Sequence, residues 1–218
     1  MQGQGQGRAA GARATVGTDR GERTRRQILD AAAPVFAEHG YAGASLNQII
    51  LRSGVTKGGF YFHFPSKLAL ALAVVGDHNA RWFDRVMAEV ATQPRAIDRL
   101  FALPRVLVHS TLAGEGPQYL RKLTDELSRD PALRDEVCGS VRIGIETTAQ
   151  QFREAQADGQ IRPDIDPEVI AEVCVGSFTG MQTLTEQLAD DQLERRVEAL
   201  IQVVRTATEM RPQEGGAS

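Results

Sequence analysis

Apolar residues recur three and four positions apart along most of the chain, which is the spacing of an amphipathic helix. The first clear case begins at Ile28 and ends at Gly40, and no segment alternates apolar and polar residues as a half-buried strand does. The pattern therefore predicts an all-α protein with about nine helices. After the first helix, we expect helices at residues 45–53, 56–64, 65–90, 94–112, 119–127, 131–157, 168–188 and 191–210.

Prolines mark several of the expected boundaries. Pro65, Pro94 and Pro167 fall at first turns, where the missing N–H of proline removes no helical hydrogen bond. Pro34 and Pro104 instead lie inside expected helices. There the ring clashes with the preceding turn, so we expect a kink in the first helix and a kink or break near Pro104.

Both ends of the chain differ from this helical body. Residues 1–20 are rich in Gly, Gln, Ala and Arg and contain almost no large apolar side chain. Such a segment buries too little surface to offset its loss of conformational entropy, so we expect a disordered arm in which Arg8 and Arg13 only aid solubility. Residues 212–218 are expected to be disordered as well.

Several classes of protein are excluded by composition. The 218-residue chain has two cysteines, too few for a disulfide scaffold, and no cluster of zinc ligands. Its longest apolar run, from Leu68 to Val75, is far shorter than the roughly 18–20 residues that span a bilayer. The N-terminal segment lacks the apolar core of a secretory signal. We therefore expect a cytoplasmic protein without metal, cofactor or membrane anchor.

The distribution of charge changes the meaning of the net charge. The sum is −3, which by itself argues against a nucleic-acid-binding protein. Residues 1–68, however, contain nine Lys and Arg against four Asp and Glu, a net charge of +5. The remaining residues contain sixteen against twenty-four, a net charge of −8. A basic N-terminal third on an acidic body indicates an anionic partner.

The basic third contains the pattern of a helix-turn-helix. Ser45 is placed to cap a short helix, and Gly54 lies where a tight turn between two helices needs a positive φ. Thr56 is placed to cap the second helix, whose N-terminal end would face an anion with Lys57 beside it. Gly58 has no side chain, so the backbone can approach a phosphate or a base closely. This is the layout of a helix that reads the major groove of DNA.

Four aromatic residues follow within five positions. Phe60 and Phe64 share one helical face and are expected in the core. Tyr61 lies on the opposite side, where its hydroxyl can donate to a phosphate. Phe62 has two interpretations of equal weight: contact with a thymine methyl group, or packing within the protein.

The stretch from Thr24 to Leu70 resembles the DNA-binding domain of the tetracycline-repressor (TetR) family of bacterial transcription regulators. The residues that carry the resemblance are 28–32, Phe36, 39–41, Ser45, Leu46, Ile49, 55–58, 61–64 and Lys67. The resemblance implies three N-terminal helices and a six-helix regulatory domain, in agreement with the helix count. The expected limits are 1–20 for the arm, 21–68 for the DNA-binding domain, 69–211 for the ligand-binding and dimerisation domain, and 212–218 for the tail.

The same resemblance implies roles for individual residues. Those at positions that touch DNA in the family, mostly at phosphates, are Thr56, Lys57, Gly58, Tyr61, His63 and Lys67. Those near base edges are Asn47, Gly59 and Phe62. Together with Ser45 they form the set of candidate DNA-binding residues.

A narrower resemblance is to the γ-butyrolactone receptors of antibiotic-producing actinomycetes. It rests on residues 49–51, 54–58, 61–64 and 175–182. In that subgroup a tryptophan of the seventh helix lines the ligand pocket, whereas residues 142–146 here contain no tryptophan. The resemblance therefore implies a receptor-like repressor whose butyrolactone binding is altered or lost.

The C-terminal two thirds contain no catalytic constellation, so we do not expect an enzyme. His78 and His109 are isolated from any nucleophile, and Cys138 and Cys174 are expected to be small core residues. A helical enzyme would instead need polar groups that converge around one of these histidines.

The last two expected helices have broad apolar faces, with Gly176 and Gly180 spaced for a close helix approach. These faces either pack within the chain or, as the family resemblance implies, form a four-helix interface with a second copy. A twofold dimer would match a palindromic operator, because its two recognition helices would lie one DNA turn apart. The candidate interface residues are Val173, Gly176, Phe178, Gly180, Leu184, Val197, Leu200, Ile201 and Val204.

A ligand cavity is expected between these helices and the DNA-binding domain. The candidate lining residues, each equally well explained as plain core, are Trp82, Phe83, Met87, Leu107, Leu123, Thr147, Gln151, Phe178 and Gln182. The sequence thus predicts a homodimeric repressor of double-stranded DNA that a small-molecule effector releases, with a γ-butyrolactone-like molecule as one candidate. The alternative is a regulator of the same fold with no ligand, or with a broad multidrug ligand.

Overall fold

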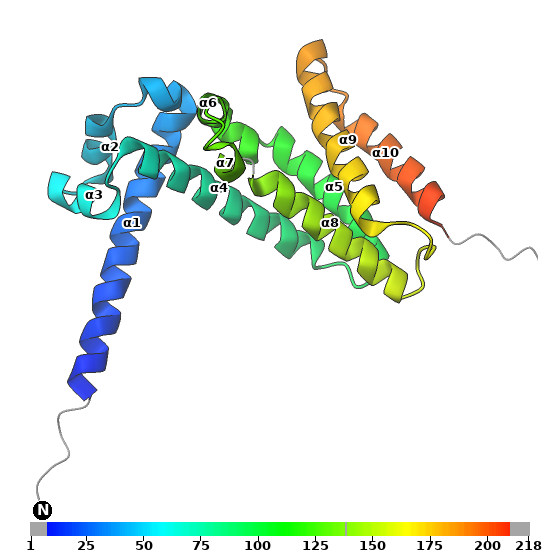
Figure 1. The fold of residues 1–218 in the computed structure, drawn as a ribbon, viewed down its shortest axis with the longest axis horizontal. Coiled ribbons are helices and arrows are strands. Elements are labelled where there is room, and N and C mark those ends of the chain that lie inside the picture. Colours follow the sequence, from blue (N-terminus) through cyan, green and yellow to red (C-terminus); the bar gives the residue numbers. More distant parts are fainter. Residues whose placement is uncertain (1–7, 138, 210–218) are drawn as a thin grey trace, which may run out of the picture. The chain divides into compact units, whose positions relative to one another are not determined.

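The computed structural model describes residues 8–137 and 139–209, and helices are the only regular elements in this part of the chain (Figure 1). The all-α class predicted from the sequence is confirmed. In chain order the elements are α1 (Arg8–Gly43), α2 (Leu46–Ser53), α3 (Lys57–His63), α4 (Lys67–Val90), α5 (Ala96–Leu112), the 3-10 helix η1 (Pro117–Leu120), α6 (Arg121–Leu127), α7 (Arg134–Val137), α8 (Gly139–Ala157), α9 (Pro167–Leu188) and α10 (Leu193–Thr208).

The helices form two compact units. The first contains Met1–His78 and Leu120–Val137, and the second contains Asn79–Tyr119 and Cys138–Ser218. This division differs from the expected boundary between residues 68 and 69, because the first half of α4 and helices α6 and α7 pack with the N-terminal helices. The expected helix over 131–157 is likewise divided into α7 and α8 on either side of residue 138, which lies outside the described residues.

The core of the first unit joins α1, α2, α3, α4 and α6. Phe36 of α1, Ile49 of α2, Phe60 of α3, Leu70 of α4 and Leu123 of α6 are all fully buried in one cluster. Burial of Phe60 confirms the core position expected for it. Full burial of a side chain of this size contributes about 1.5–3 kcal/mol, so these five residues hold the short helices in place.

The first helix is longer than the sequence predicts. It begins at Arg8, so its backbone is helical through most of the segment expected to be a disordered arm, while residues 1–7 lie outside the described residues. Extending an existing helix adds one hydrogen bond for each residue fixed, and the alanines of this segment favour that extension. The expected disorder of residues 8–20 is therefore wrong for this structure.

The two internal prolines do not end their helices. Pro104 lies within the continuous helix α5, so the predicted break there is wrong. In α1 the non-helical backbone occurs at Gly40 and not at Pro34, where the sequence predicts a kink. Proline removes one hydrogen bond, and packing of the buried faces on both sides of it can outweigh that loss.

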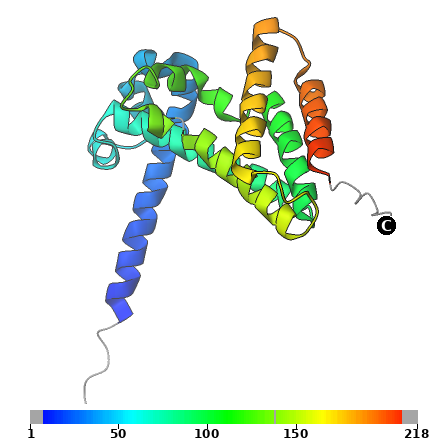
Figure 2. The ribbon, with the colours of Figure 1, turned by 45° about the vertical axis from the view of Figure 1, so that its right-hand side comes forward.

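The second unit has its own core between α5, α8, α9 and α10, whose ribbons Figure 2 shows from another side. Phe101 of α5, Phe152 of α8 and Ile201 of α10 are nearly or fully buried in it. Ion pairs at the edge of this core link the same helices, because Arg99 of α5 donates to Glu154 of α8 at 2.9 Å. Each unit thus has an apolar core of its own.

We predict that Gly40→Ala destabilises the first unit. Gly40 has φ 68° and ψ −170°, and an added Cβ would lie 2.1 Å from Oε1 of Glu126, whose other carboxylate oxygen accepts the Ala42 N–H at 2.7 Å. The strained backbone and the displaced carboxylate should lower the free energy of unfolding by roughly 1–3 kcal/mol, measured by urea denaturation. Gly43→Ala is the control, since its Cβ would meet only His39 Cβ at an ordinary 3.4 Å. Equal stability of the two variants would contradict the prediction.

Candidate DNA-reading surface and ligand cavity

The turn between α2 and α3 is fixed by capping groups. Ser45 caps α2, and its hydroxyl accepts the Gln48 N–H at 3.5 Å. Gly54 ends the helix in the left-handed conformation, with φ 69°. Thr56 caps α3 and accepts the Gly59 N–H at 3.1 Å. These local contacts set the direction in which α3 leaves the turn.

One face of α3 is buried and the other is open. Phe60 is 0% exposed, whereas Phe62 is 84% exposed and Tyr61 is 42% exposed. Phe62 is therefore not part of the core of the first unit. A Cβ on Gly58 would meet nothing within 4 Å, so the fold itself places no demand for glycine there. Together with exposed Lys57, this face presents cationic, aromatic and bare backbone groups.

Lys67 and His63 have contacts within the protein besides any contact with DNA. The Lys67 ammonium donates to the Ala42 carbonyl at 3.2 Å and lies 5.0 Å from the Tyr41 ring centroid. It thereby ties the start of α4 to the end of α1. The His63 ring meets Phe62 edge to face, with centroids 5.2 Å apart. Asn47 is exposed on the first turn of α2.

Part of α1 lies beside α3, a contact that the sequence does not predict. A Cβ on Gly21 would lie 4.0 Å from Cε1 of His63, and the Arg25 guanidinium carbon lies 5.4 Å from the Phe64 ring centroid. The part of α1 around Gly21 and Arg25 therefore lies beside α3. No local motif predicts a contact between residues so far apart in the sequence.

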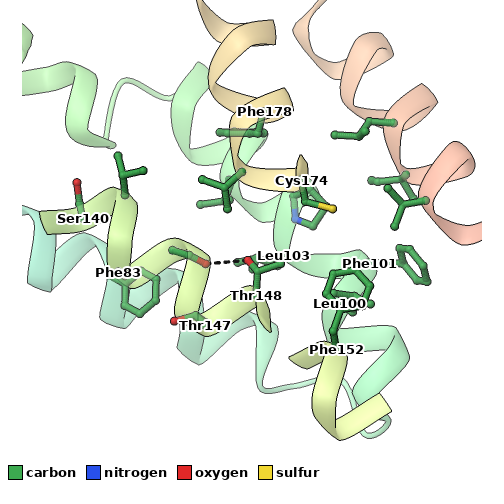
Figure 3. A pocket seen from close by; sticks show the side chains of 18 of the residues that line it. Phe83, Leu100, Phe101, Leu103, Ser140, Thr147, Thr148, Phe152, Cys174 and Phe178 are labelled. Carbon is green, nitrogen blue, oxygen red and sulfur yellow. Dashed lines mark hydrogen bonds between the residues drawn. The ribbon is translucent and has the colours of Figure 1, made fainter. Parts of the chain in front are cut away.

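A cavity of about 170 Å³ lies inside the second unit (Figure 3). Side chains of α5, α8 and α9 line it, together with the second half of α4 and with α10. The lining residues are Trp82, Phe83, Leu100, Phe101, Leu103, Pro104, Leu107, Pro117, Ser140, Val141, Gly144, Thr147, Thr148, Phe152, Cys174, Val175, Phe178, Leu200, Ile201 and Val204.

The cavity wall is apolar and carries no charged side chain. Some of its polar groups are already engaged: the Thr148 hydroxyl donates to the Gly144 carbonyl at 2.8 Å, and the Trp82 indole N–H donates to Ser110 Oγ at 2.6 Å. Burial raises the pKa of the Cys174 thiol to about 11, so this group is neutral near pH 7. An uncharged, largely apolar molecule is the occupant that such a wall favours, because a charge here would lose its hydration without a partner.

The structure brings together five of the nine candidate ligand-binding residues, namely Trp82, Phe83, Leu107, Thr147 and Phe178. The others lie elsewhere. Leu123 belongs to the core of the first unit, and Met87 packs beside Val86 and Val90. Gln151 is buried outside the lining, and Gln182 donates to Thr111 Oγ1 at 3.1 Å. Phe101 and Phe152 were missed because their spacing is that of any core residue.

The apolar faces of α9 and α10 point in two directions. Val197, Ile201 and Val204 are buried within the unit, and Phe178 and Leu200 line the cavity, so these five candidate interface residues face inward. The outward face of α9 is different. It contains exposed Val169, Val173, Leu184 and Leu188 together with Gly176 and Gly180, where an added Cβ would meet nothing within 4 Å.

Among residues 8–137 and 139–209, no group of three or more His, Cys, Asp or Glu side chains could hold a metal ion. No single helix there is long and apolar enough to cross a membrane, although α3 and α4 taken together as a bent pair satisfy the criteria of length and composition.

Both units match known family models. The model of the tetR family of bacterial regulatory proteins matches residues 28–74, and that of the tetracyclin repressor-like C-terminal domain matches residues 98–201. The A-factor receptor protein of Streptomyces griseus is 32% identical over 174 residues, which are 77% of this chain and 56% of that protein. The match thus spans little more than half of that relative's length.

Solved structures agree with these matches. Full-length native TylP, a TetR regulator from Streptomyces fradiae, is 30% identical with a TM-score of 0.65, and the alignment covers 88% of this chain and 89% of TylP. A structure solved for the molecular basis of control of antibiotic production by bacterial hormones is 28% identical with a TM-score of 0.66, covering 86% and 98% of the two chains. The narrower resemblance to the receptors of actinomycetes is therefore confirmed.

Proposed function

Because the chain belongs to the TetR family of bacterial transcription regulators, we propose that it is a cytoplasmic repressor that binds a palindromic DNA operator as a homodimer and releases it when a small molecule enters the cavity. The observation that carries the DNA-binding part is the open face of α3. There Lys57, Gly58 and Phe62 are exposed on a helix whose opposite side is fixed by buried Phe60. A helix held in this way can enter the major groove without rearrangement of the core.

The residues proposed to contact DNA divide into two groups. Lys57, Tyr61 and His63 offer hydrogen-bond donors that suit phosphate oxygens. Thr56 and Gly58 are exposed, so the protein backbone at these residues can approach the DNA strand that carries those phosphates. Near the bases, Phe62 suits a thymine methyl group, while Asn47 and Gly59 line the approach. Lys67 and Ser45 support this surface as positioning residues, since both are engaged with the backbone of the first unit.

The outward face of α9 supports the proposed dimer. Val173 is 51% exposed and Leu184 is 42% exposed, an unfavourable arrangement for a monomer in water. Gly176 and Gly180 lie between them and leave room for the backbone of a second copy to approach closely. A twofold dimer formed through this face would carry two copies of α3, and a palindromic operator offers one half-site for each copy, about 34–36 Å apart.

The cavity supports an uncharged effector of limited size. A cavity of about 150 Å³ holds a benzene molecule, and the present one is about 170 Å³. It therefore suits a small ring, and a ligand with a long alkyl tail would have to displace lining side chains. A γ-butyrolactone ring is uncharged and of the right size, and the similarity to the A-factor receptor protein supports this class of ligand.

The alternatives receive less support. A regulator without a ligand would be expected to have a filled second unit, and a broad sensor of cationic drugs would need acidic groups in the wall. The second unit contains a cavity, and the residues that line this cavity include no acidic side chain.

We predict that Lys57→Ala weakens binding to operator and random-sequence duplexes alike. The operator is first obtained by unbiased selection from random duplexes. A lost phosphate contact should reduce the slope of log affinity against log salt by about 0.9 per protomer, measured by fluorescence anisotropy at several salt concentrations. Arg195→Ala is the control, because it removes the same charge from an exposed position of α10. Unchanged affinity and slope would exclude Lys57 from the contacts.

We predict that γ-butyrolactones with short alkyl substituents release the operator and that their ring-opened carboxylates do not, because the cavity is small and its wall has no cation for a carboxylate. Gly144→Leu should keep operator binding and lose this release. Its side chain would enter the cavity, where a Cβ now meets nothing within 4 Å. Gly139→Leu, on the same helix and outside the lining, is the control. Equal release by lactone and carboxylate would contradict the assigned ligand class.

We predict that Val173→Glu yields monomers in sedimentation velocity experiments. A carboxylate at the centre of an apolar interface would be desolvated without a partner. Leu112→Glu places the same charge at a residue that is 61% exposed at the end of α5, and this control should stay dimeric. A dimeric Val173→Glu variant would place the interface elsewhere.

A further inference from the structure

The hydrogen-bonding groups of the cavity are unevenly distributed over its wall. Trp82 contributes an indole and Cys174 a thiol, and the remaining three polar side chains of the lining all belong to α8. These are the hydroxyls of Ser140, Thr147 and Thr148. The parts of the wall that α5 and α10 supply are apolar throughout. An effector in the cavity therefore meets hydroxyl groups on one helix and hydrocarbon on the helices opposite.

The two ends of the cavity differ along α8 itself. The lining begins with Ser140 and ends with Phe152, which belongs to the same apolar core as Phe101. Figure 3 shows Ser140 and Thr147 on one side of the view and Phe152, Phe101 and Leu100 on the other. Thr147 and Phe152 are about 7.5 Å apart along the helix axis, at 1.5 Å per residue. A small ring with a short substituent can thus reach from the hydroxyl end to the aromatic end.

The three hydroxyls differ in their availability to a ligand. The Thr148 hydroxyl donates to the Gly144 carbonyl at 2.8 Å, so its proton is already used within the helix. Ser140 stands beside Val141, which is 47% exposed, and a hydroxyl near water gains little from exchanging water for a ligand. Within residues 8–137 and 139–209, the hydroxyl of half-buried Thr147 donates to no protein atom. Thr147 is therefore the hydroxyl donor of this wall that is both available and shielded.

The chemistry of the wall defines the acceptor that suits Thr147. When an apolar ligand displaces water from a hydroxyl, the donor is left without a partner, and that loss counts against binding. A carboxylate could accept the proton, but the lining has no cation to compensate its charge. A neutral carbonyl oxygen accepts the same hydrogen bond without a buried charge.

We propose that Thr147 determines the specificity of the cavity by donating its hydroxyl proton to a neutral carbonyl oxygen of the effector. The apolar part of the effector then lies toward Phe101 and Phe152. The inference rests on the proposed function, which places the effector in this cavity, and adds the orientation in which it binds. In a γ-substituted butyrolactone the carbonyl and the substituent leave the ring on different sides of the ring oxygen, so one molecule can satisfy both ends.

The test uses two adjacent threonines of the full-length protein. Thr147→Val removes the available hydroxyl, and the control Thr148→Val removes the hydroxyl that is bound to Gly144, at nearly constant side-chain volume. Each protein is titrated without DNA with γ-methyl-γ-butyrolactone and with methylcyclopentane, a hydrocarbon of similar shape that has no acceptor. Binding is followed by the fluorescence of Trp82, the single tryptophan of the chain, which lines the cavity. Circular dichroism and thermal unfolding check that both variants fold.

Thr147→Val should lose about 2- to 12-fold in affinity for the lactone, the range expected for one hydrogen bond, and keep its affinity for methylcyclopentane. Thr148→Val should bind both probes as the wild type does. Wild-type lactone affinity in Thr147→Val, or an equal loss in both variants, would overturn the inference and leave the proposed function intact. A wild-type protein that binds neither probe would instead refute the lactone class of the proposed function, and the inference with it.

The orientation is tested by enlarging one end of the cavity at a time. Leu200→Ala makes room where Leu200 packs against the core that contains Phe101 and Phe152, and Val141→Ala makes room beside Ser140. Leu200→Ala should raise the affinity for γ-propyl-γ-butyrolactone relative to the γ-methyl compound, by up to about fourfold for each methylene that is accommodated. Val141→Ala should leave this ratio unchanged. The same gain in Val141→Ala in place of Leu200→Ala would overturn the assigned orientation.

Discussion

The proposed DNA-reading surface, the open face of α3, depends on the burial of one aromatic side chain. Helix α3 has only seven residues, far fewer than a helix needs to be stable by itself in water. Phe60 is 0% exposed in the cluster that α1, α2, α4 and α6 complete, and this burial gives α3 the packing energy that its length cannot supply. Because Phe60 fixes the inner face, the exposure of Lys57 and Phe62 on the outer face follows from helical geometry.

Helix α4 is one continuous helix that contributes residues both to the core beneath this surface and to the lining of the cavity. In its first half Leu70 and Val74 are buried in the core of the first unit, and in its second half Trp82 and Phe83 line the cavity. Near the boundary between the units, Arg26 of α1 donates to Asp77 of α4 at 2.8 Å. Phe83 therefore lies on the same continuous helix as Leu70 and Val74, which are buried in the core of the first unit.

Sequence reasoning worked where the determinants are local. The caps at Ser45 and Thr56 and the turn at Gly54 are each set by a few neighbouring residues, and the structure has them as predicted. The faces of α9 and α10 are a different problem. Val173 and Val197 have the same side chain and similar helical surroundings, yet one is 51% exposed and the other 1%. Periodicity shows that a face is apolar, but which neighbour covers it depends on how separate helices pack together, and that is not encoded locally.

The positive and negative net charges of the chain lie mainly on different units of the structure. The net charge of +5 on residues 1–68 belongs to the first unit, while most of the net charge of −8 on the remaining residues belongs to the second unit. An acidic second unit repels DNA, so the protein gains affinity only when the basic head faces the duplex. In a twofold dimer two basic heads would bind at once, and phosphate contacts add to the salt-dependent affinity in proportion to their number. The acidic second unit then serves the same end, since it disfavours orientations in which the basic N-terminal part does not face the duplex.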